Sequence, residues 1–233
     1  MCGIIGYVGS EPAVPVLVEG LRCLEYRGYD SAGLAVVTPD GELEVRRAPG
    51  KLKNLEAELR EHPLEGSYGV GHTRWATHGV PSEENAHPHR DNSGKIVVVH
   101  NGIIENYVHL KRRLSEEGHS FETDTDTETI VHLIASLYEG DLEAAVRQAV
   151  VELEGIYAFA VMSLDEPQKI VAARQGPPLI VGLGEGQQFI ASDVTPILSH
   201  SRRVVFLDDE QIATVTPAGV QISNFAGDSA GKF

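Results

Sequence analysis

The apolar residues of this chain follow strand spacing in some stretches and helix spacing in others, and stretches of one kind come in groups. Strand-like runs lie at 4–8, 31–37, 42–47, 67–76 and 96–104, and most of the chain after Tyr157 has strand character. Helix-like runs lie at 14–24, 51–61, 106–117, 127–138 and 141–154. Clustered strands with helices grouped between them are typical of the α+β class. Two antiparallel sheets faced by helices would use all of these elements.

Short turns link the strands of the C-terminal part, as in an antiparallel meander. The segment GLGEG (182–186) superficially resembles a dinucleotide-binding loop, but such a loop leads from a strand into a helix. Here QQFIASD continues as a strand, so we expect a hairpin turn. The last residues, NFAGDSAGKF, are small and polar, and we expect them to be frayed.

Length and charge limit the classes of protein that the chain can belong to. Its 233 residues fit one large domain or two small ones, and they need neither disulfide nor metal to form a core. The net charge of −15 argues against nucleic acid and anionic membranes as partners. The longest apolar runs have strand length, and no basic, apolar targeting segment is visible. We therefore expect a cytoplasmic protein.

The two cysteines have different settings. Only one disulfide is conceivable, between Cys2 and Cys23, which fits a reducing compartment. We expect Cys23, on the first helix, to be a small buried hydrophobe. Cys2 has another option, because removal of Met1 would give it a free α-amino group beside its thiol.

Histidines in HTRWATHG and AHPHR raise the question of a metal site, formed by His72, His78, His87 and His89. None of them has a recognised ligand spacing such as H-E-x-x-H on a helix. We expect loop histidines that bind backbone or substrate, with no metal and no cofactor.

Three other segments each allow an ordinary and a functional interpretation. Arg74 beside Trp75 is either a surface arginine next to a core aromatic or a guanidinium that forks onto a substrate carboxylate. Asn101 and Gly102 form either a simple turn or a pair of donors for an oxyanion. The acidic segment ETDTDTETI (122–130) either caps a helix or binds a substrate ammonium group.

Together these segments resemble the class II glutamine amidotransferases, a branch of the N-terminal-nucleophile hydrolases. The resemblance is carried by CGIIGYVG, LEYRGYDSAG (24–33), GHTRWATHG (71–79), NAHPH (85–89), HNGIIEN (100–106) and TDTETI (125–130). YRGYDSAG and HTRWATHG are most similar to the glutaminase domains of glucosamine-6-phosphate synthases. The resemblance implies a four-layer αββα sandwich of two mainly antiparallel sheets over residues 1–225. Residues 226–233 would then form a tail toward sugar-isomerase domains.

The resemblance also implies a catalytic set. Cys2 would be the nucleophile after removal of Met1, and its own α-amino group would be the base, since such a group titrates near pH 8. Asn101 and the Gly102 N–H would hold the oxyanion. Arg27 and Gly28 would lie near the nucleophile.

Recognition of the amino-acid end of the substrate is implied by two further segments. Arg74 would bind the α-carboxylate of L-glutamine, with Thr77 and His78 completing the pocket and Trp75 in a loop that closes over the substrate. Asp126 would bind the α-ammonium group. Its neighbour Asp124 is a rival, and we choose Asp126 because the pattern Asp-Thr-Glu-x-Ile-x-His-Leu follows it.

The implied function is hydrolysis of L-glutamine to glutamate and ammonia through a cysteine thioester. In the full-length enzyme the ammonia would convert fructose 6-phosphate, bound by sugar-isomerase domains, into glucosamine 6-phosphate. Formation of a homodimer through those domains is a further possibility. Two alternatives remain: the glutaminase domain of a purine-pathway amidophosphoribosyltransferase, and a glutamine-binding regulatory module without hydrolysis.

Overall fold

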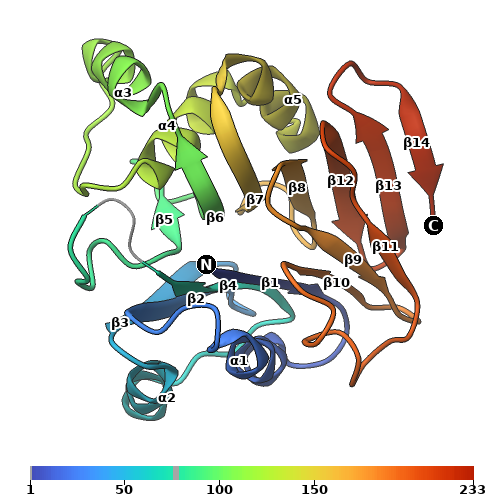
Figure 1. Ribbon diagram of the computed structural model, residues 1–233. Helices are drawn as coiled ribbons and strands as arrows, with labels where there is room; N and C mark the ends of the chain where they lie inside the picture. The colour runs from blue at the N-terminus through green and yellow to red at the C-terminus, as the bar shows by residue number, and fades with distance from the viewer. Residues whose placement is uncertain (1, 76–78) are drawn as a thin grey trace.

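Two seven-stranded sheets lie face to face, with helices on both outer surfaces. The computed structural model describes residues 2–75 and 79–233. In Figure 1, helices α3, α4 and α5 lie over the upper sheet, and α1 and α2 lie below the lower one. Every pair of neighbouring strands in both sheets is antiparallel. The expected four-layer α+β sandwich is therefore confirmed.

The lower sheet has the strand order β11-β9-β10-β1-β4-β2-β3. Its strands are β1 (Gly3–Val8), β2 (Ser31–Val37), β3 (Leu43–Pro49), β4 (Tyr68–Arg74), β9 (Ile180–Leu183), β10 (Gln188–Ala191) and β11 (Val204–Phe206). Helices α1 (Ala13–Leu24) and α2 (Leu52–Glu61) cover its outer face. The segment 182–186 ends β9 and begins the short turn into its antiparallel neighbour β10, so the expected hairpin turn is confirmed.

The upper sheet has the order β14-β13-β12-β8-β7-β6-β5. Its strands are β5 (His89–Arg90), β6 (Ile96–Ile104), β7 (Gly155–Ser163), β8 (Ile170–Gln175), β12 (Gln211–Thr216), β13 (Gly219–Asn224) and β14 (Ser229–Lys232). It is covered by α3 (Tyr107–Glu116), α4 (Thr127–Leu137) and α5 (Leu142–Glu152). The expectation of a frayed C-terminus is wrong for Ser229–Lys232, because these residues pair with β13.

Three apolar layers hold the sandwich together, and strand periodicity assigns side chains to them. Along β1, Ile4 and Val8 join the core between the two sheets, whereas Ile5 and Tyr7 join the core under α1 and α2. The third layer packs α3, α4 and α5 onto the upper sheet. Because central strands are apolar on both faces, they have the continuous hydrophobic runs seen in the sequence.

Two further expectations can be compared with the structure. Cys23 is exposed on α1, so the expectation that it is buried is wrong. It lies on the helix next to Arg22, away from the buried face of Leu17, Leu21 and Leu24. Across the two described ranges, no helix combines the length and apolar character needed to cross a membrane.

Candidate active site

The candidate site lies where the core between the sheets gives way to polar side chains. Ile4 of β1 and Val70 of β4 both belong to that core. Because strand side chains alternate, the same face continues to Cys2 just before β1 and to His72 and Arg74 in β4. The two strands are neighbours, with Ile4 opposite His72. The nucleophile candidate and the arginine candidate therefore come together from adjacent strands.

The opposite sheet contributes in the same way. Val97 and Val99 of β6 belong to the core between the sheets, so alternation brings Asn101 to that face. Asn101 and Gly102 lie inside β6, opposite Ala158 and Tyr157 of β7, and do not form a simple turn. The ordinary interpretation of this pair is thus excluded.

A very small cavity lies beside Cys2, between residues of the two sheets. It has a volume of about 10 Å³, which is about the space of one water molecule. The cavity is lined by Cys2, Arg74, Trp75, His87, His100, Gly102, Thr125, Asp126 and Thr127.

The Cys2 sulfur is held by the backbone of Trp75. Sγ accepts a hydrogen bond from the Trp75 N–H at 3.2 Å and donates one to the Trp75 carbonyl at 3.4 Å. Burial raises the pKa of the Cys2 thiol, and the Trp75 N–H and the Arg74 charge offset this only in part. The resting group at neutral pH is therefore the thiol, which needs a base before it can act as a nucleophile.

The Asn101 side chain is fixed at both ends. Its Nδ2 donates to the Cys2 carbonyl at 3.1 Å, and its Oδ1 lies 3.0 Å from Nε2 of His72. Gly102 follows with a φ of +129°, which side chains rarely permit. A Cβ at Gly102 would lie 2.0 Å from the Ile156 carbonyl oxygen, so only glycine fits. The two expected oxyanion donors thus stand beside the cysteine.

Arg74 brings a buried positive charge to the cavity. Its side chain is bonded to the backbone of the loop that follows, with Nη2 3.3 Å from the Gly79 carbonyl and Nη1 3.5 Å from the Val80 carbonyl. Burial lowers its pKa, while the charges of Asp30 and Asp126 act in the opposite direction. A surface position for Arg74 is excluded, because only 4% of the residue is exposed.

The two candidate aspartates have different environments. Asp126 is buried and lines the cavity, and its Oδ2 accepts the Ile104 N–H at 2.9 Å. It makes no side-chain capping hydrogen bond to α4. Asp124 is exposed, and its N–H donates to Asn85. The geometry thus favours Asp126 as the carboxylate that could meet a ligand in the cavity.

Arg27 lies in an ion pair with a distant part of the chain. Its Nη2 is 2.7 Å from Oδ2 of Asp193, which also accepts the Tyr26 hydroxyl at 2.6 Å. Arg27 is not among the residues that line the small cavity. Gly28 packs directly on β4, since a Cβ there would lie 2.7 Å from the Arg74 carbonyl carbon. This contact gives Gly28 a role in placing the arginine strand.

The remaining expected residues flank the cavity or fall outside the described ranges. Trp75 is 47% exposed, and its ring contacts Tyr29 edge to face at 5.3 Å. It is therefore not a core aromatic. Thr77 and His78 lie outside the residues that the structure describes.

Sequence reasoning named His72, His87 and His89 but missed that they are buried beside the site together with His100. His72 and His89 lie in strands, and all four rings of the cluster are buried, so the expectation of loop histidines is wrong for these two. His87 stacks on His72 with ring centroids 4.1 Å apart. Its neighbours in the cluster are His89 and His100.

Threonines of the acidic segment bind these histidines. Thr127 Oγ1 lies 3.2 Å from Nε2 of His87 and 2.9 Å from Nδ1 of His100, and Thr125 Oγ1 lies 3.1 Å from Nε2 of His89. Val70 and His72 are two residues apart in a predicted strand, so they share a face. This alternation could have placed His72 on the face of β4 that points toward the other sheet.

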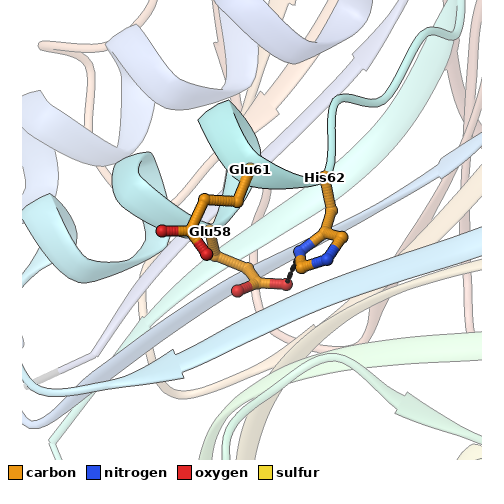
Figure 2. Close-up of side chains that lie close together, drawn as sticks. All are labelled: Glu58, Glu61 and His62. Carbon is orange, nitrogen blue, oxygen red and sulfur yellow. Dashed lines mark hydrogen bonds and ion pairs between the residues drawn. The ribbon is translucent and has the colours of Figure 1, made fainter.

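One group of side chains in the described ranges has the spacing of a metal site, namely Glu58, Glu61 and His62 at the end of α2 (Figure 2). Nδ1 of His62 is 2.9 Å from a Glu58 oxygen, as expected for an i, i+4 pair on a helix. Two of the three residues are exposed, and exposed acidic groups are common without an ion. The group therefore supports no metal assignment.

The layered fold and the arrangement around Cys2 define a class of protein, and comparison with known families identifies it. The family model described as "Glutamine amidotransferase domain" matches residues 72–199. The chain belongs to this family of glutamine amidotransferase domains.

Two curated relatives show high similarity over nearly the whole chain. A protein of Aquifex aeolicus named glutamine–fructose-6-phosphate aminotransferase (isomerizing) is 51% identical over 232 residues, covering 100% of this chain and 39% of that protein. The protein of the same name from Clostridium perfringens is 53% identical over 222 residues, covering 95% of this chain and 36% of that protein. The chain thus spans about two fifths of the length of these relatives.

Solved structures show the same fold at lower identity. Glutamine phosphoribosylpyrophosphate amidotransferase from B. subtilis, solved with ADP and GMP, superposes with a TM-score of 0.82 at 24% identity, over 96% of this chain and 49% of that one. A structure described as the allosteric regulatory enzyme of purine biosynthesis has a TM-score of 0.84 at 25% identity, with the same coverage.

Proposed function

We propose that this chain hydrolyses L-glutamine to glutamate and ammonia, with Cys2 as the nucleophile. One observation carries the proposal: Cys2 lines the same small cavity as the cation Arg74, the anion Asp126 and Gly102, and Asn101 donates a hydrogen bond to the Cys2 carbonyl. A zwitterionic amino acid fits Arg74 and Asp126 with its α-carboxylate and α-ammonium groups. Its side-chain amide then reaches the sulfur and the donors of Asn101 and Gly102.

The chemistry needs a base, because burial keeps Cys2 in its thiol form. After removal of Met1, the α-amino group of Cys2 takes the thiol proton, and Sγ attacks the amide carbon. Asn101 Nδ2 and the Gly102 N–H stabilise the negative oxygen that forms. The ammonium group returns the proton to the leaving nitrogen, and ammonia departs. Water then hydrolyses the thioester, which releases glutamate and restores the thiol.

The other site residues support binding and closure in this proposal. Thr77 and His78 complete the carboxylate pocket, and Trp75 closes over the bound glutamine. Gly28 keeps the Arg74 strand in place through its close backbone contact. Arg27 fixes the neighbouring loop through Asp193.

We further propose that the ammonia serves synthesis of glucosamine 6-phosphate from fructose 6-phosphate, with the sugar bound by further domains of a longer protein. The names and high identity of the curated relatives support this assignment, as does the share of their length that the chain spans. The alternative, a glutaminase domain of a purine-pathway amidophosphoribosyltransferase, is supported only by similarity of fold at 24–25% identity. A cytoplasmic location is supported by two free cysteines.

An assay of glutamine hydrolysis by this chain tests the proposed function. We expect glutamate and ammonia in equal amounts, and no amino sugar when fructose 6-phosphate is added. The sugar should not be consumed, because we assign its binding to further domains of a longer protein. Absence of glutamate formation would contradict the proposed hydrolysis, and amino-sugar formation would contradict the proposed division of labour.

Recognition of the amino-acid end gives a paired prediction. Arg74→Lys keeps the charge but loses the two-pronged contact, so we expect KM for glutamine to rise about 10-fold or more. Asp126→Asn should raise KM similarly, whereas the matched change Asp124→Asn should have little effect, because Asp124 is exposed. Steady-state kinetics of the three variants measure this. The reverse order for the two aspartates would show that the wrong carboxylate has been assigned.

A further inference from the structure

His72 lies directly behind the proposed oxyanion side chain. Its ring is fully buried in β4, and Nε2 is 3.0 Å from Oδ1 of Asn101 in the opposite sheet. This contact joins the two sheets at the point where their shared core ends. His72 has no place in the reaction steps described above, and it does not line the cavity.

The hydrogen-bond network assigns the direction of this contact. The Cys2 carbonyl can only accept a hydrogen bond, so the Asn101 atom that faces it at 3.1 Å must be the amide nitrogen. The other end of the amide is then Oδ1, which also can only accept. Nε2 of His72 must therefore carry the hydrogen.

The surroundings of His72 favour the neutral ring. Burial lowers the pKa of His72 to about 3, so the ring is uncharged at neutral pH. One face stacks on His87 at 4.1 Å. The His100 backbone and the Asn101 side chain both contact the ring and oppose part of this pKa shift. A ring held in this way has little freedom to turn.

We propose that His72 is a positioning residue that locks the Asn101 amide with its NH2 group toward the cysteine. This inference rests on the proposed function, since it explains how one oxyanion donor is kept in place. One amide hydrogen is used by the Cys2 carbonyl, and the second remains for the negative oxygen formed during attack. Without His72, Oδ1 loses its donor, and the amide can rotate or turn over. A misplaced donor weakens stabilisation of the transition state more than binding of glutamine.

Variants of His72 test the proposal through the division between kcat and KM. Glutamine can place its amide NH2 near the position of Nε2, whereas leucine fills the space without a donor. We expect His72→Leu to lower kcat about 10- to 100-fold with KM changed less than about threefold, and His72→Gln to restore most of the loss. Thermal unfolding of both variants shows whether the fold survives.

A double mutant separates positioning from general damage. If His72 acts through Asn101, adding His72→Leu to Asn101→Ala should cause little further loss of kcat. Additive losses, or a His72→Gln variant as poor as His72→Leu, would overturn the proposal.

A measurement independent of activity completes the test. Nitrogen-15 NMR of the histidine rings in the unmodified chain should show His72 with hydrogen on Nε2 and none on Nδ1. The opposite tautomer would overturn the positioning role. A wild-type chain that fails to hydrolyse glutamine would instead contradict the proposed function, and the tautomer would still report on the His72–Asn101 contact.

Discussion

Replacing Cys2 by alanine is expected to abolish glutamine hydrolysis, with a loss of at least about 10⁴-fold in kcat. The sulfur forms the thioester bond, and the oxyanion donors Asn101 and Gly102 cannot replace a nucleophile. Glutamine binding should change only a few-fold, because Arg74 and Asp126 remain in place. Steady-state assays of glutamate release, together with calorimetric titration of glutamine, measure the two effects separately.

Cys23 provides the matched control. It is the second cysteine of the chain, and it is exposed on α1 rather than beside the cavity. Cys23→Ala should therefore retain wild-type turnover. Substantial hydrolysis by Cys2→Ala, or its loss in Cys23→Ala, would contradict the assignment of the nucleophile.

The second large effect is expected for Gly102→Ala. A Cβ would meet the Ile156 carbonyl oxygen at 2.0 Å, and the φ of +129° is itself unfavourable for alanine. Strand β6 would have to shift away from β7, and this would displace both oxyanion donors. We expect a loss of about 10²- to 10³-fold in kcat, as for removal of an oxyanion donor, together with a lower Tm.

Gly118→Ala separates backbone strain from the local clash. Gly118 also has a positive φ, +101°, but a Cβ there would meet nothing within 4 Å. This variant should cost only about 1 kcal/mol of stability and leave kcat unchanged. If Gly102→Ala behaved like Gly118→Ala in both respects, the Gly102 peptide would not have the proposed role.

Much of the fold could be predicted from the sequence, because its strands and helices have clear periodicities. The run IVVVHNGII is apolar on both faces of β6, and its alternation brings Asn101 to the face shared with Val97 and Val99. The same rule places Cys2 on the face that Ile4 occupies, and Ile4 lies opposite His72 in the adjacent strand. Local rules of this kind fix which face a side chain occupies.

Contacts between distant segments could not be predicted in this way. Arg27 pairs with Asp193, which is 166 positions away in the chain, and periodicity gives no distance between such residues. The His72–Asn101 contact depends on how the two sheets are stacked, which neither strand specifies alone. The prediction that Cys23 is buried was wrong because helix periodicity does not fix the width of the apolar stripe. Gly20, three residues before Cys23, is buried, yet Cys23 lies beyond the edge of the stripe and faces solvent.

The central claim is that Cys2, freed from Met1, is the residue that attacks glutamine. Intact-mass spectrometry after treatment with an electrophilic glutamine analogue tests it most directly, with peptide mapping of the adduct and the Cys2→Ala variant alongside. We expect one adduct per chain, located on Cys2, in molecules that lack Met1, and no adduct in Cys2→Ala. An adduct on Cys23, or equal labelling and turnover in molecules that retain Met1, would contradict the claim.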